Sequence, residues 1–491
     1  MARDIVVGLA MGTTATKVVA FTADGRAVAE ASHGYPLDVP APGRAEQDPR
    51  LILDAVVRGI REVVASVGSD RVAGLSFSSA MHSLLALDEN GEPLTNVVTW
   101  ADTRASAVAE RIRDNGGLEV HRRTGTPIHP MSPLVKLAWF RENEPALAAA
   151  RWAGIKDWII LQMTGRLVVD HSLASGMGLM NMHELDWDAE ALSVAGVTAA
   201  QLPTLVATTD VVGGLLDAFA SWVGLDEGTP VVAGAGDGPL ANLGVGAVRP
   251  GVAALSIGTS GALRVAVDKP AVDEAGGVFC YALTADRWVV GGAINNGGVT
   301  LDWVREQVGG ETSELLDEAL EIPAGSGGLL MLPYLLGERA PHWGGTARGA
   351  YIGLTKAHSR GHLVRAAVEG VSLQLALVKQ SLESAGLDIA EIRATGGVMR
   401  HELWRQTLAS AIGSAMSFPS SSEGSCLGGA ILGMQALGLI DSIDEAAALV
   451  PVEASLPPLE ADAEVYARLL PSFAALYELL EPTNKLLATL A

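Results

Sequence analysis

Short apolar runs that end in polar, glycine-containing turns alternate along this chain with longer stretches in which apolar residues recur at helical spacing. The runs at residues 72–77, 84–87, 97–104 and 391–394 predict strands, and the stretches 51–67, 134–140, 360–385 and 465–480 predict helices. Further helices are expected near residues 156, 301 and 402 and after the segment 423–429. Strands that alternate with helices along a chain are typical of an α/β fold.

Two stretches predict β-hairpins of the same design. Residues 5–9 and 18–21 are apolar and enclose a Gly-Thr-Thr turn, and residues 251–267 repeat this pattern around Gly-Thr-Ser-Gly. Glycine permits the positive φ that a tight turn can require, and hydroxyl and backbone N–H groups on such a turn can cradle a phosphate. The candidate phosphate-binding residues are Gly12, Thr13, Thr14 and Lys17 in the first hairpin and Gly258, Thr259 and Ser260 in the second.

The two hairpins lie about half of the 491-residue chain apart. This spacing predicts a duplicated domain with a cleft between its halves, divided near Gly246 into residues 1–246 and 247–491. Two phosphate-binding turns that face each other across a cleft would hold a polyphosphate such as ATP.

A single carboxylate stands in a glycine-rich stretch after the apolar run that begins at residue 230. In Gly234-Ala235-Gly236-Asp237-Gly238 the glycines leave Asp237 open to a bound substrate. The stretch differs from the dinucleotide motif because an Asp interrupts it and because it does not open the first βαβ unit. Two interpretations of Asp237 remain open at this stage, a catalytic carboxylate and a cap for the following helix.

Polar residues at the ends of other predicted strands are well placed to face a ligand crevice. They are Ser79, Met81 and His82 after the run 72–77, and Trp100, Asp102 and Arg104 within the run 97–104. The competing interpretations are a hydrogen-bonded loop histidine and a local ion pair beside a core tryptophan. Double glycines at residues 297–298 and 396–397 each precede a predicted helix, where a phosphate or a flat ring can approach the backbone.

Composition and charge narrow the class of protein. Hydrophobic residues make up 49% and charged residues 18% of the chain, as in ordinary globular proteins. The net charge of −22 disfavours nucleic-acid binding and means that an anionic ligand must be held by local positive groups and helix ends. The two cysteines, Cys280 and Cys426, provide no disulfide framework or zinc motif, which fits a reducing cytoplasm. No run predicts a signal peptide or membrane span.

With these motifs in place, the chain resembles the FGGY carbohydrate kinases, of the actin-like ATPase (ribonuclease H-like) superfold, over essentially its whole length. The stretch MSPLVKLAWFREN at residues 131–143 and the stretch at residues 349–369 match the two signatures of that family. The matching positions are Pro133, Lys136 and Trp139 in the first signature and Gly353, His362 and Glu369 in the second. The resemblance implies two ribonuclease H-like domains with a cleft between them.

Within the family, the stretches SSAMHS, TWADTR and DHSLASGMGLMN look like those of gluconate kinases. Xylulose kinases usually have Met-His-Gly where this chain has Met81-His82-Ser83. The resemblance therefore implies phosphorylation of D-gluconate to 6-phospho-D-gluconate by ATP. The residues expected to contact the sugar acid are Ser79, Met81, His82, Trp100, Asp102, Arg104, Lys156 and Asp237.

The resemblance also implies roles for the glycine-rich turns. ATP and Mg²⁺ would lie in the cleft, with the phosphates on the two hairpin turns, and Asp237 would act as general base on the terminal hydroxyl of the sugar and hold the metal through water. The residues expected to hold the nucleotide further include Gly297, Gly298, Gly396, Gly397 and Arg400. The family also suggests a homodimer.

One position departs from the family pattern Gly-x-Asp-x-Gly-Thr, because Ala10 stands where the Asp helps to hold Mg²⁺. A methyl group cannot replace a carboxylate beside a divalent cation. Either ATP, water and Asp237 hold the metal, or activity is impaired. Three alternatives remain open. The first is a xylulokinase or another pentulose or polyol kinase of the same family, the second is a non-catalytic sugar or nucleotide sensor, for which Ala10 is the only support, and the third is a chaperone-like ATPase. The last is disfavoured because no peptide-binding β domain follows.

Overall fold

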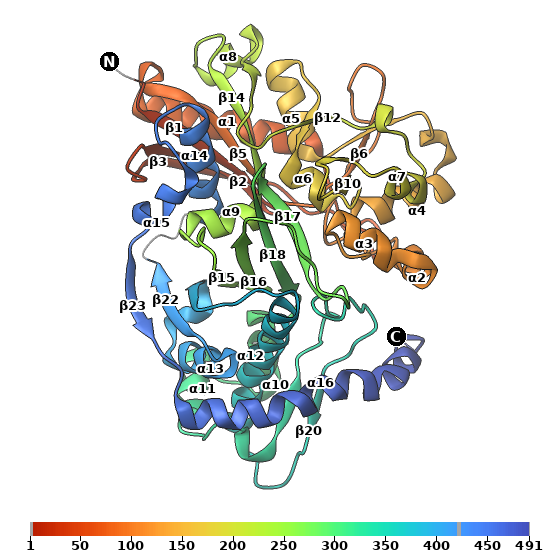
Figure 1. Ribbon diagram of the computed structural model, residues 1–491, viewed down its shortest axis with the longest axis vertical. Helices are drawn as coiled ribbons and strands as arrows, with labels where there is room; N and C mark the ends of the chain where they lie inside the picture. Colours follow the sequence, from red (N-terminus) through yellow and green to blue (C-terminus); the bar gives the residue numbers. More distant parts are fainter. Residues whose placement is uncertain (1–2, 420–423, 491) are drawn as a thin grey trace.

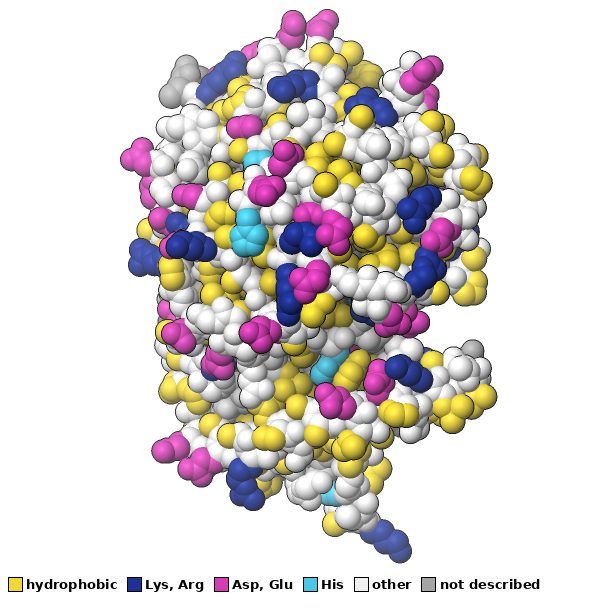
Figure 2. Space-filling view, turned by 45° about the vertical axis from the view of Figure 1, so that its right-hand side comes forward, with side chains coloured by type: hydrophobic (Ala, Val, Ile, Leu, Met, Phe, Trp, Pro, Cys, Tyr) yellow, Lys and Arg dark blue, Asp and Glu magenta, His cyan; other side chains and the backbone are white. Residues whose placement is uncertain are grey.

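The computed structural model describes residues 3–419 and 424–490. Two mixed β-sheets follow one another along the long axis of the molecule, and helices flank both of them (Figure 1). None of the helices in the described ranges is long and apolar enough to cross a membrane. On the face shown in Figure 2, acidic and basic side chains are interspersed, so the negative net charge is not gathered there into one patch.

The first sheet has six strands in the order β13-β14-β5-β1-β2-β3. β14, β5 and β1 are parallel, whereas the pairs β13–β14, β1–β2 and β2–β3 are antiparallel. The strands are β1 (Ile5–Met11), β2 (Ala15–Thr22), β3 (Ala27–Gly34), β5 (Val72–Ser79), β13 (Val211–Gly214) and β14 (Pro230–Gly236).

The second sheet has seven strands in the order β17-β18-β16-β15-β21-β22-β23. The strands are β15 (Val252–Ile257), β16 (Gly261–Val267), β17 (Phe279–Thr284), β18 (Arg287–Ile294), β21 (Glu391–Thr395), β22 (Ala415–Pro419) and β23 (Val452–Leu456). Here β15, β21 and β22 are parallel, and the pairs β22–β23, β15–β16 and β16–β18 are antiparallel.

Strand order and direction therefore match between the two sheets, with β23-β22-β21-β15-β16-β18 repeating β13-β14-β5-β1-β2-β3. The hairpin β15–β16 occupies the place that β1–β2 has in the first sheet. This topology confirms the expected α/β fold with two ribonuclease H-like units. The strand β17 is the additional edge strand of the second sheet, and its Ala282 N–H donates to Ser175 Oγ at 3.1 Å, which joins the two halves.

The central strand β1 of the first sheet is buried on both faces because it is apolar at nearly every position. In β1, Ile5, Val7 and Leu9 face the core that contains helix α1 (Pro49–Val67), while Val6 faces the core that contains helix α14 (Gly424–Ala436). A strand of a parallel sheet that is covered on both sides has such a continuous apolar run.

Helix α14 comes late in the sequence but packs on the first sheet, beside β1 and β5 (Figure 1). Small residues allow this approach, because a Cβ at Gly8 would lie 2.6 Å from the carbonyl oxygen of Cys426. Ser76 Oγ also donates to the carbonyl of Gly429 at 2.6 Å. The division of the chain at Gly246 stays a prediction, since the second half supplies a layer of the first.

The remaining helices pack around the two large sheets (Figure 1). They are α2 (Ser106–Ile112), α3 (Leu118–Thr124), α4 (Pro133–Asn143), α5 (Ile155–Thr164), α6 (His171–Gly176), α7 (Ala189–Ala195), α8 (Asp217–Val223), α9 (Asp237–Gly244), α10 (Gly298–Val308), α11 (Thr312–Leu320), α12 (Arg360–Ser384), α13 (Glu402–Ile412), α15 (Ala446–Leu449) and α16 (Glu460–Ala488).

Five two-stranded ladders complete the structure. They pair β4 (Glu46–Gln47) with β7 (Val97–Val98), β6 (Leu85–Leu87) with β8 (Arg151–Ala153), β9 (Val168–Asp170) with β12 (Thr204–Val206), β10 (Met180–Asn181) with β11 (Asp186–Trp187), and β19 (Leu330–Leu332) with β20 (Ala350–Ile352).

Several element boundaries differ from the expectations. The strand expected over residues 97–104 ends at Val98, because the following residues turn. Helix α14 already begins at Gly424 within the segment 423–429, whose first residue, Glu423, lies outside the described residues. Neither Gly12 nor Gly258 has a positive φ. The first turn closes instead through a bond from Gly12 N–H to Ala15 O at 2.9 Å.

Candidate active site

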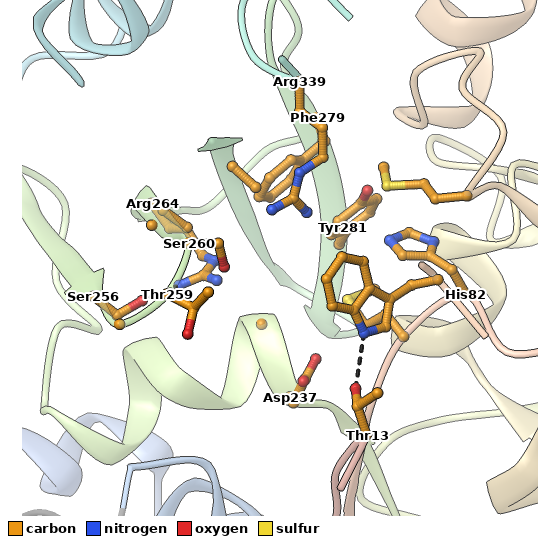
Figure 3. A pocket seen from close by; sticks show the side chains of 18 residues that line it. Thr13, His82, Asp237, Ser256, Thr259, Ser260, Arg264, Phe279, Tyr281 and Arg339 are labelled. Atoms are coloured by element: carbon orange, nitrogen blue, oxygen red, sulfur yellow. Dashed lines mark hydrogen bonds between the residues drawn. The ribbon is translucent and has the colours of Figure 1, made fainter. Parts of the chain in front are cut away.

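Two cavities meet at the turn of the second hairpin. The central cavity has a volume of about 420 Å³ and the outer cavity about 590 Å³, and both are lined by Gly258 and Thr259. The other residues around the central cavity are Thr13, Met81, His82, Trp100, Met131, Asp237, Gly238, Ser256, Ser260, Gly261, Ala262, Arg264, Phe279, Tyr281, Ala293 and Arg339 (Figure 3). Those around the outer cavity are Gly298, Leu301, Asp302, Thr312, Ser313, Leu316, Gly397, Val398, Arg400, His401 and Trp404.

Asp237 lies at the first position of helix α9, directly after β14, and its carboxylate faces the central cavity (Figure 3). The helix is capped by Gly236 without a side-chain hydrogen bond, so the Asp237 side chain does not fill the N-cap position. Burial raises the pKa of Asp237, and the charge of Arg264 and backbone N–H groups of Gly238 and Met81 oppose that rise. A buried carboxylate of raised pKa is a suitable proton acceptor at neutral pH.

The turn of the second hairpin is held against the start of helix α10. The N–H groups of Gly298 and Gly297 donate to the carbonyls of Gly258 and Thr259, at 2.7 and 3.0 Å. The hydroxyls of Thr259 and Ser260 lie at the central cavity (Figure 3). The first N–H groups of helix α10 are thus bonded to carbonyls of the turn, and the hydroxyls of Thr259 and Ser260 are the donors that this turn presents to an anion.

The turn of the first hairpin lies across the central cavity, but only Thr13 among its candidate residues lines it. Trp100 Nε1 donates to Thr13 Oγ1 at 2.8 Å, and Gln47 Nε2 donates to the Thr13 carbonyl at 2.6 Å. Gly12 lies beside a narrow adjoining pocket, where its carbonyl accepts from Tyr35 at 2.7 Å. Lys17 forms an ion pair with Glu30 at 3.2 Å, and neither Lys17 nor Thr14 lines the cavities described above.

His82 forms part of the wall opposite the second hairpin. Its backbone has a φ of 66°, and its Nδ1–H donates to the carbonyl of Gly176 at 2.7 Å. Burial lowers the pKa of His82 to about 3, so the ring is neutral and its Nε2 is an acceptor. Buried Lys136 donates to the carbonyls of His82 and Thr99, each at 2.7 Å, which braces the two loops that carry His82 and Trp100.

The structure brings two arginines to the central cavity that the sequence analysis did not select. Arg264 extends from β16, and Arg339 lies in the loop after β19. Burial lowers the pKa of Arg264 to about 10, while the charge of Asp237 opposes that shift. Burial also lowers the pKa of Arg339. A charged residue inside the apolar strand GALRVAV was the available signal for Arg264, because a buried arginine requires a partner.

Four residues expected at the sugar site lie outside both cavities. Asp102 accepts from Ala45 N–H at 2.8 Å and pairs with Arg104 at 2.7 Å, and the Arg104 guanidinium lies over the ring of Trp139. This is the local ion pair that was the competing interpretation. Lys156 is fully buried, pairs with Asp170 and donates to the Ala233 carbonyl at 2.7 Å, and Ser79 is buried in β5. None of these four side chains lines either cavity, and a contact between them and the sugar stays a prediction.

The residues expected to hold the nucleotide are divided between the outer cavity and its floor. Gly298, Gly397 and Arg400 line the outer cavity together with Gly258 and Thr259. Gly297 and Gly396 lie beneath, where an added Cβ would stand 2.7 Å from the carbonyl oxygen of Ser260 and 2.0 Å from that of Ile257, respectively. A Cβ at either position would collide with the neighbouring backbone, so glycine allows these segments to pack closely beneath the cavity.

The described residues do not form a metal site of their own. No group of three or more His, Cys, Asp or Glu side chains in the ranges 3–419 and 424–490 could hold a metal ion, and Asp237 is the one carboxylate at the central cavity. Ala10 contributes a methyl group on β1, where its neighbour on β5 is Ser78. Among the described residues, the central cavity therefore offers Mg²⁺ a single carboxylate, and this ion usually combines one or two carboxylates with water and the phosphates of the substrate.

The chain is similar to known proteins over almost its full length. Residues 5–244 match the N-terminal domain, and residues 253–437 the C-terminal domain, of the FGGY family of carbohydrate kinases. A gluconokinase of Bacillus subtilis is 44% identical over 96% of each chain. A crystal structure of gluconate kinase from Lactobacillus acidophilus has a TM-score of 0.93 at 35% identity and covers 97% of this chain and 98% of its own. The ligand-bound xylulose kinase from the same organism has a TM-score of 0.94 at 35% identity, with 98% of each chain covered. The chain therefore belongs to the FGGY family of carbohydrate kinases, and it is a phosphotransferase.

Proposed function

We propose that this chain catalyses the ATP-dependent phosphorylation of D-gluconate to 6-phospho-D-gluconate. One observation carries the proposal, namely a cavity at which a single carboxylate and two guanidinium groups, all three partly buried, come together. A cavity of that charge favours an anionic substrate although the whole chain has a net charge of −22. The names of the gluconate kinase relatives support the same substrate.

In this proposal ATP occupies the outer cavity. Leu301, Leu316 and Trp404 offer apolar surface for the base, and the Thr259 hydroxyl and the Arg400 side chain offer donors to the phosphates. The chain of phosphates would then pass Gly258 and Thr259, which line both cavities, and reach the central cavity.

Asp237 would be the general base. The terminal hydroxyl of gluconate would give its proton to the Asp237 carboxylate while its oxygen bonds to the γ-phosphorus, and the bond from that phosphorus to the leaving oxygen of ADP would break. Phosphoryl transfer requires mainly positioning and neutralisation of charge. Thr13, Thr259 and Ser260 supply hydroxyl donors around this point.

Mg²⁺ would enter this site as part of the ATP complex, and Asp237 would contact it through water. Since the described residues provide one carboxylate at the cavity, water and the phosphates of ATP would supply most of its ligands, and we assign no step to a metal ion held by the protein alone. The observation that Ala10 lacks a carboxylate favours a second candidate function, a catalytically impaired protein that binds sugar and nucleotide.

The test is an assay of ATP-dependent phosphorylation of D-gluconate, D-xylulose, L-ribulose and glycerol. It would be run on the parent chain and on the variants Ala10→Asp and Asp237→Asn, with Asp217→Asn, at an exposed first position of helix α8, as the matched control. We expect gluconate to be the best substrate, and Asp237→Asn to lower kcat about 10²- to 10⁴-fold while ATP binding persists.

Four other outcomes would overturn parts of the proposal. A preference for xylulose or ribulose would make the chain a pentulose kinase. Activity in Ala10→Asp alone would make the parent a disabled kinase, and binding of gluconate or ATP without phosphorylation in either would favour the sensor. Full activity of Asp237→Asn would remove Asp237 from the role of base.

A further inference from the structure

The two partly buried guanidinium groups of the central cavity lie toward different ends of it. Arg264 is grouped with Ser256, Thr259 and Ser260 on one side, whereas His82 and Tyr281 lie on the other (Figure 3). The charge of Arg339 acts on His82 and on His129, and its guanidinium lies over the ring of Trp100 at 5.5 Å. Arg339 therefore belongs to the end of the cavity formed by His82 and Trp100, and Arg264 to the end formed by the second hairpin.

At the end of the cavity formed by His82 and Trp100, the Arg339 guanidinium has an N–H group without an acceptor. Its Nη2 donates to the carbonyl of Ile294 at 3.1 Å, and its Nε is buried without a hydrogen-bond partner. The neighbouring carboxylate of Glu338 accepts instead from the N–H groups of Asn295 and Arg339 and from Asn296 Nδ2, at 2.6, 2.8 and 3.1 Å. The Tyr281 hydroxyl, at the same end, is also buried without a partner. The charge of Glu338 acts on Arg339 as well, but Arg339 Nε and the Tyr281 hydroxyl have no acceptor, and two such neighbouring donors indicate a site for an anion.

Arg264 is arranged differently. Its Nη1 donates to Ser256 Oγ at 3.3 Å, its Nε is also buried without a partner, and the charge of Asp237 favours its protonated form. This end is continuous with the outer cavity through Gly258 and Thr259. Arg264 is thus close both to the proposed base and to the turn where the phosphates would pass.

We propose that the two arginines divide the negative charges of the complex, with Arg339 binding the carboxylate of the sugar acid and Arg264 the phosphoryl group in transfer. This inference rests on the proposed function, because it needs an acid as the substrate and a phosphate as the donor. The assignment follows from the substrate, since the carboxylate and the reacting hydroxyl stand at opposite ends of gluconate. The reverse assignment would place the carboxylate where the phosphates enter.

Arg339 is then the residue that selects a sugar acid over a neutral polyol of the same length. Arginine can bind a carboxylate through two parallel N–H bonds, and Tyr281 can donate a third. Arg264 would neutralise charge that develops on the phosphoryl group, as arginines do in other phosphotransferases. It would contribute equally whatever acceptor occupies the other end.

The test compares D-gluconate with D-glucitol, which has a hydroxymethyl group in place of the carboxylate. The variants are Arg339→Gln, Arg339→Lys, Arg264→Gln and Arg264→Lys, and Arg61→Gln, exposed on helix α1, controls for the loss of one positive charge. The readouts are kcat/KM for both acceptors and the Kd of gluconate by calorimetry. Thermal melts show that each variant is folded.

We expect Arg339→Gln to lower the ratio of kcat/KM for gluconate over glucitol, and the affinity for gluconate, by about 10- to 100-fold, with partial rescue in Arg339→Lys. Arg264→Gln should lower kcat for both acceptors and leave the ratio and the Kd of gluconate near those of the parent. An unchanged ratio in Arg339→Gln, or a ratio that falls in Arg264→Gln instead, would overturn the assignment.

Failure of the proposed function has a different signature. If the parent binds gluconate with an affinity that depends on Arg339 but does not phosphorylate it, the carboxylate site stands and the kinase proposal fails. If the parent neither binds nor phosphorylates gluconate, both proposals are overturned.

Discussion

Replacing Lys156 by methionine tests whether this residue stabilises the fold or binds the sugar. The Lys156 side chain is fully buried, and so is that of its partner Asp170. Asp170 also accepts from the N–H groups of Ser172 and Leu173, at 2.9 and 3.0 Å, and so caps helix α6. The charge of Lys156 thus joins the start of α5, the cap of α6 and, through the Ala233 carbonyl, strand β14.

The expected cost follows from what the substitution leaves behind. Lys156→Met keeps most of the side-chain volume but leaves a buried carboxylate without its cation, which costs about 3–5 kcal/mol. For a domain of this size that corresponds to a fall in Tm of about 6–10 °C. The double variant Lys156→Met/Asp170→Asn removes the orphaned charge and should recover much of the loss, because the amide oxygen can still cap the helix.

The assays are thermal melts of both variants and steady-state kinetics of the folded fraction. We expect the KM for the sugar to stay within about twofold of the parent, since the Lys156 side chain does not line the cavity. A Tm within about 2 °C of the parent, together with a KM for the sugar raised tenfold or more, would refute the structural role and return Lys156 to the substrate site.

Two further predictions concern the packing and the pH dependence of the fold. Burial raises the pKa of Asp157 to about 7, opposed by the charge of Lys156 and the Gly154 N–H, so the native state binds more protons than the unfolded state between about pH 4 and 7 and loses stability as pH rises through that range. Asp157→Asn should therefore flatten the decline in Tm between pH 5 and 8, equivalent to about 2–4 kcal/mol, and a parallel decline in both proteins would contradict this reasoning. Gly428→Ala would place a Cβ 2.2 Å from the Leu240 carbonyl oxygen and should cost about 2–3 kcal/mol in thermal melts, whereas Gly345→Ala, with open space around it, should be nearly neutral. Equal melting temperatures for these two variants would show that α9 and α14 can move apart.

The topology was predictable because its signals are local. A run of apolar residues, a short glycine-containing turn and a second apolar run determine each hairpin, and the same pattern recurs where β15 and β16 follow one another. Asp237 was predictable for a similar reason, since glycines on both sides of one acid at the end of a strand leave its side chain open to a cavity. Whether it caps a helix or faces a cavity could only be decided once β14 and α9 were placed.

The positions of the two arginines and of Lys156 in the fold could not be predicted from the sequence. The partners of Lys156 are 14 and 77 positions away along the chain, and only the tertiary fold brings the Asp170 carboxylate and the Ala233 carbonyl to it. Arg339 follows an apolar run in a loop without regular structure, so no periodicity indicates which way its side chain points. A lysine beside a polar cluster and an arginine in a loop look alike in sequence, and only the folded structure shows that Arg339 lines the cavity whereas Lys156 does not.

The two hairpins contribute unequally to the central cavity, and this difference bears on Ala10. Two residues before its turn glycine the first hairpin has Ala10, and the second has Ser256 at the corresponding place, where its hydroxyl accepts from Arg264. In the proposed function, Ala10 and Arg264 affect the charge of the transfer site in the same direction. The missing carboxylate at position 10 and the guanidinium at position 264 each make this site more positive by one charge. A carboxylate at position 10 would offset that charge while it offered a ligand to the metal of the ATP complex. The effect of Ala10→Asp should therefore depend on residue 264, with a larger gain in the Arg264→Gln background if the two groups serve the same phosphoryl charge. Equal effects of Ala10→Asp in both backgrounds would show that the two positions act independently.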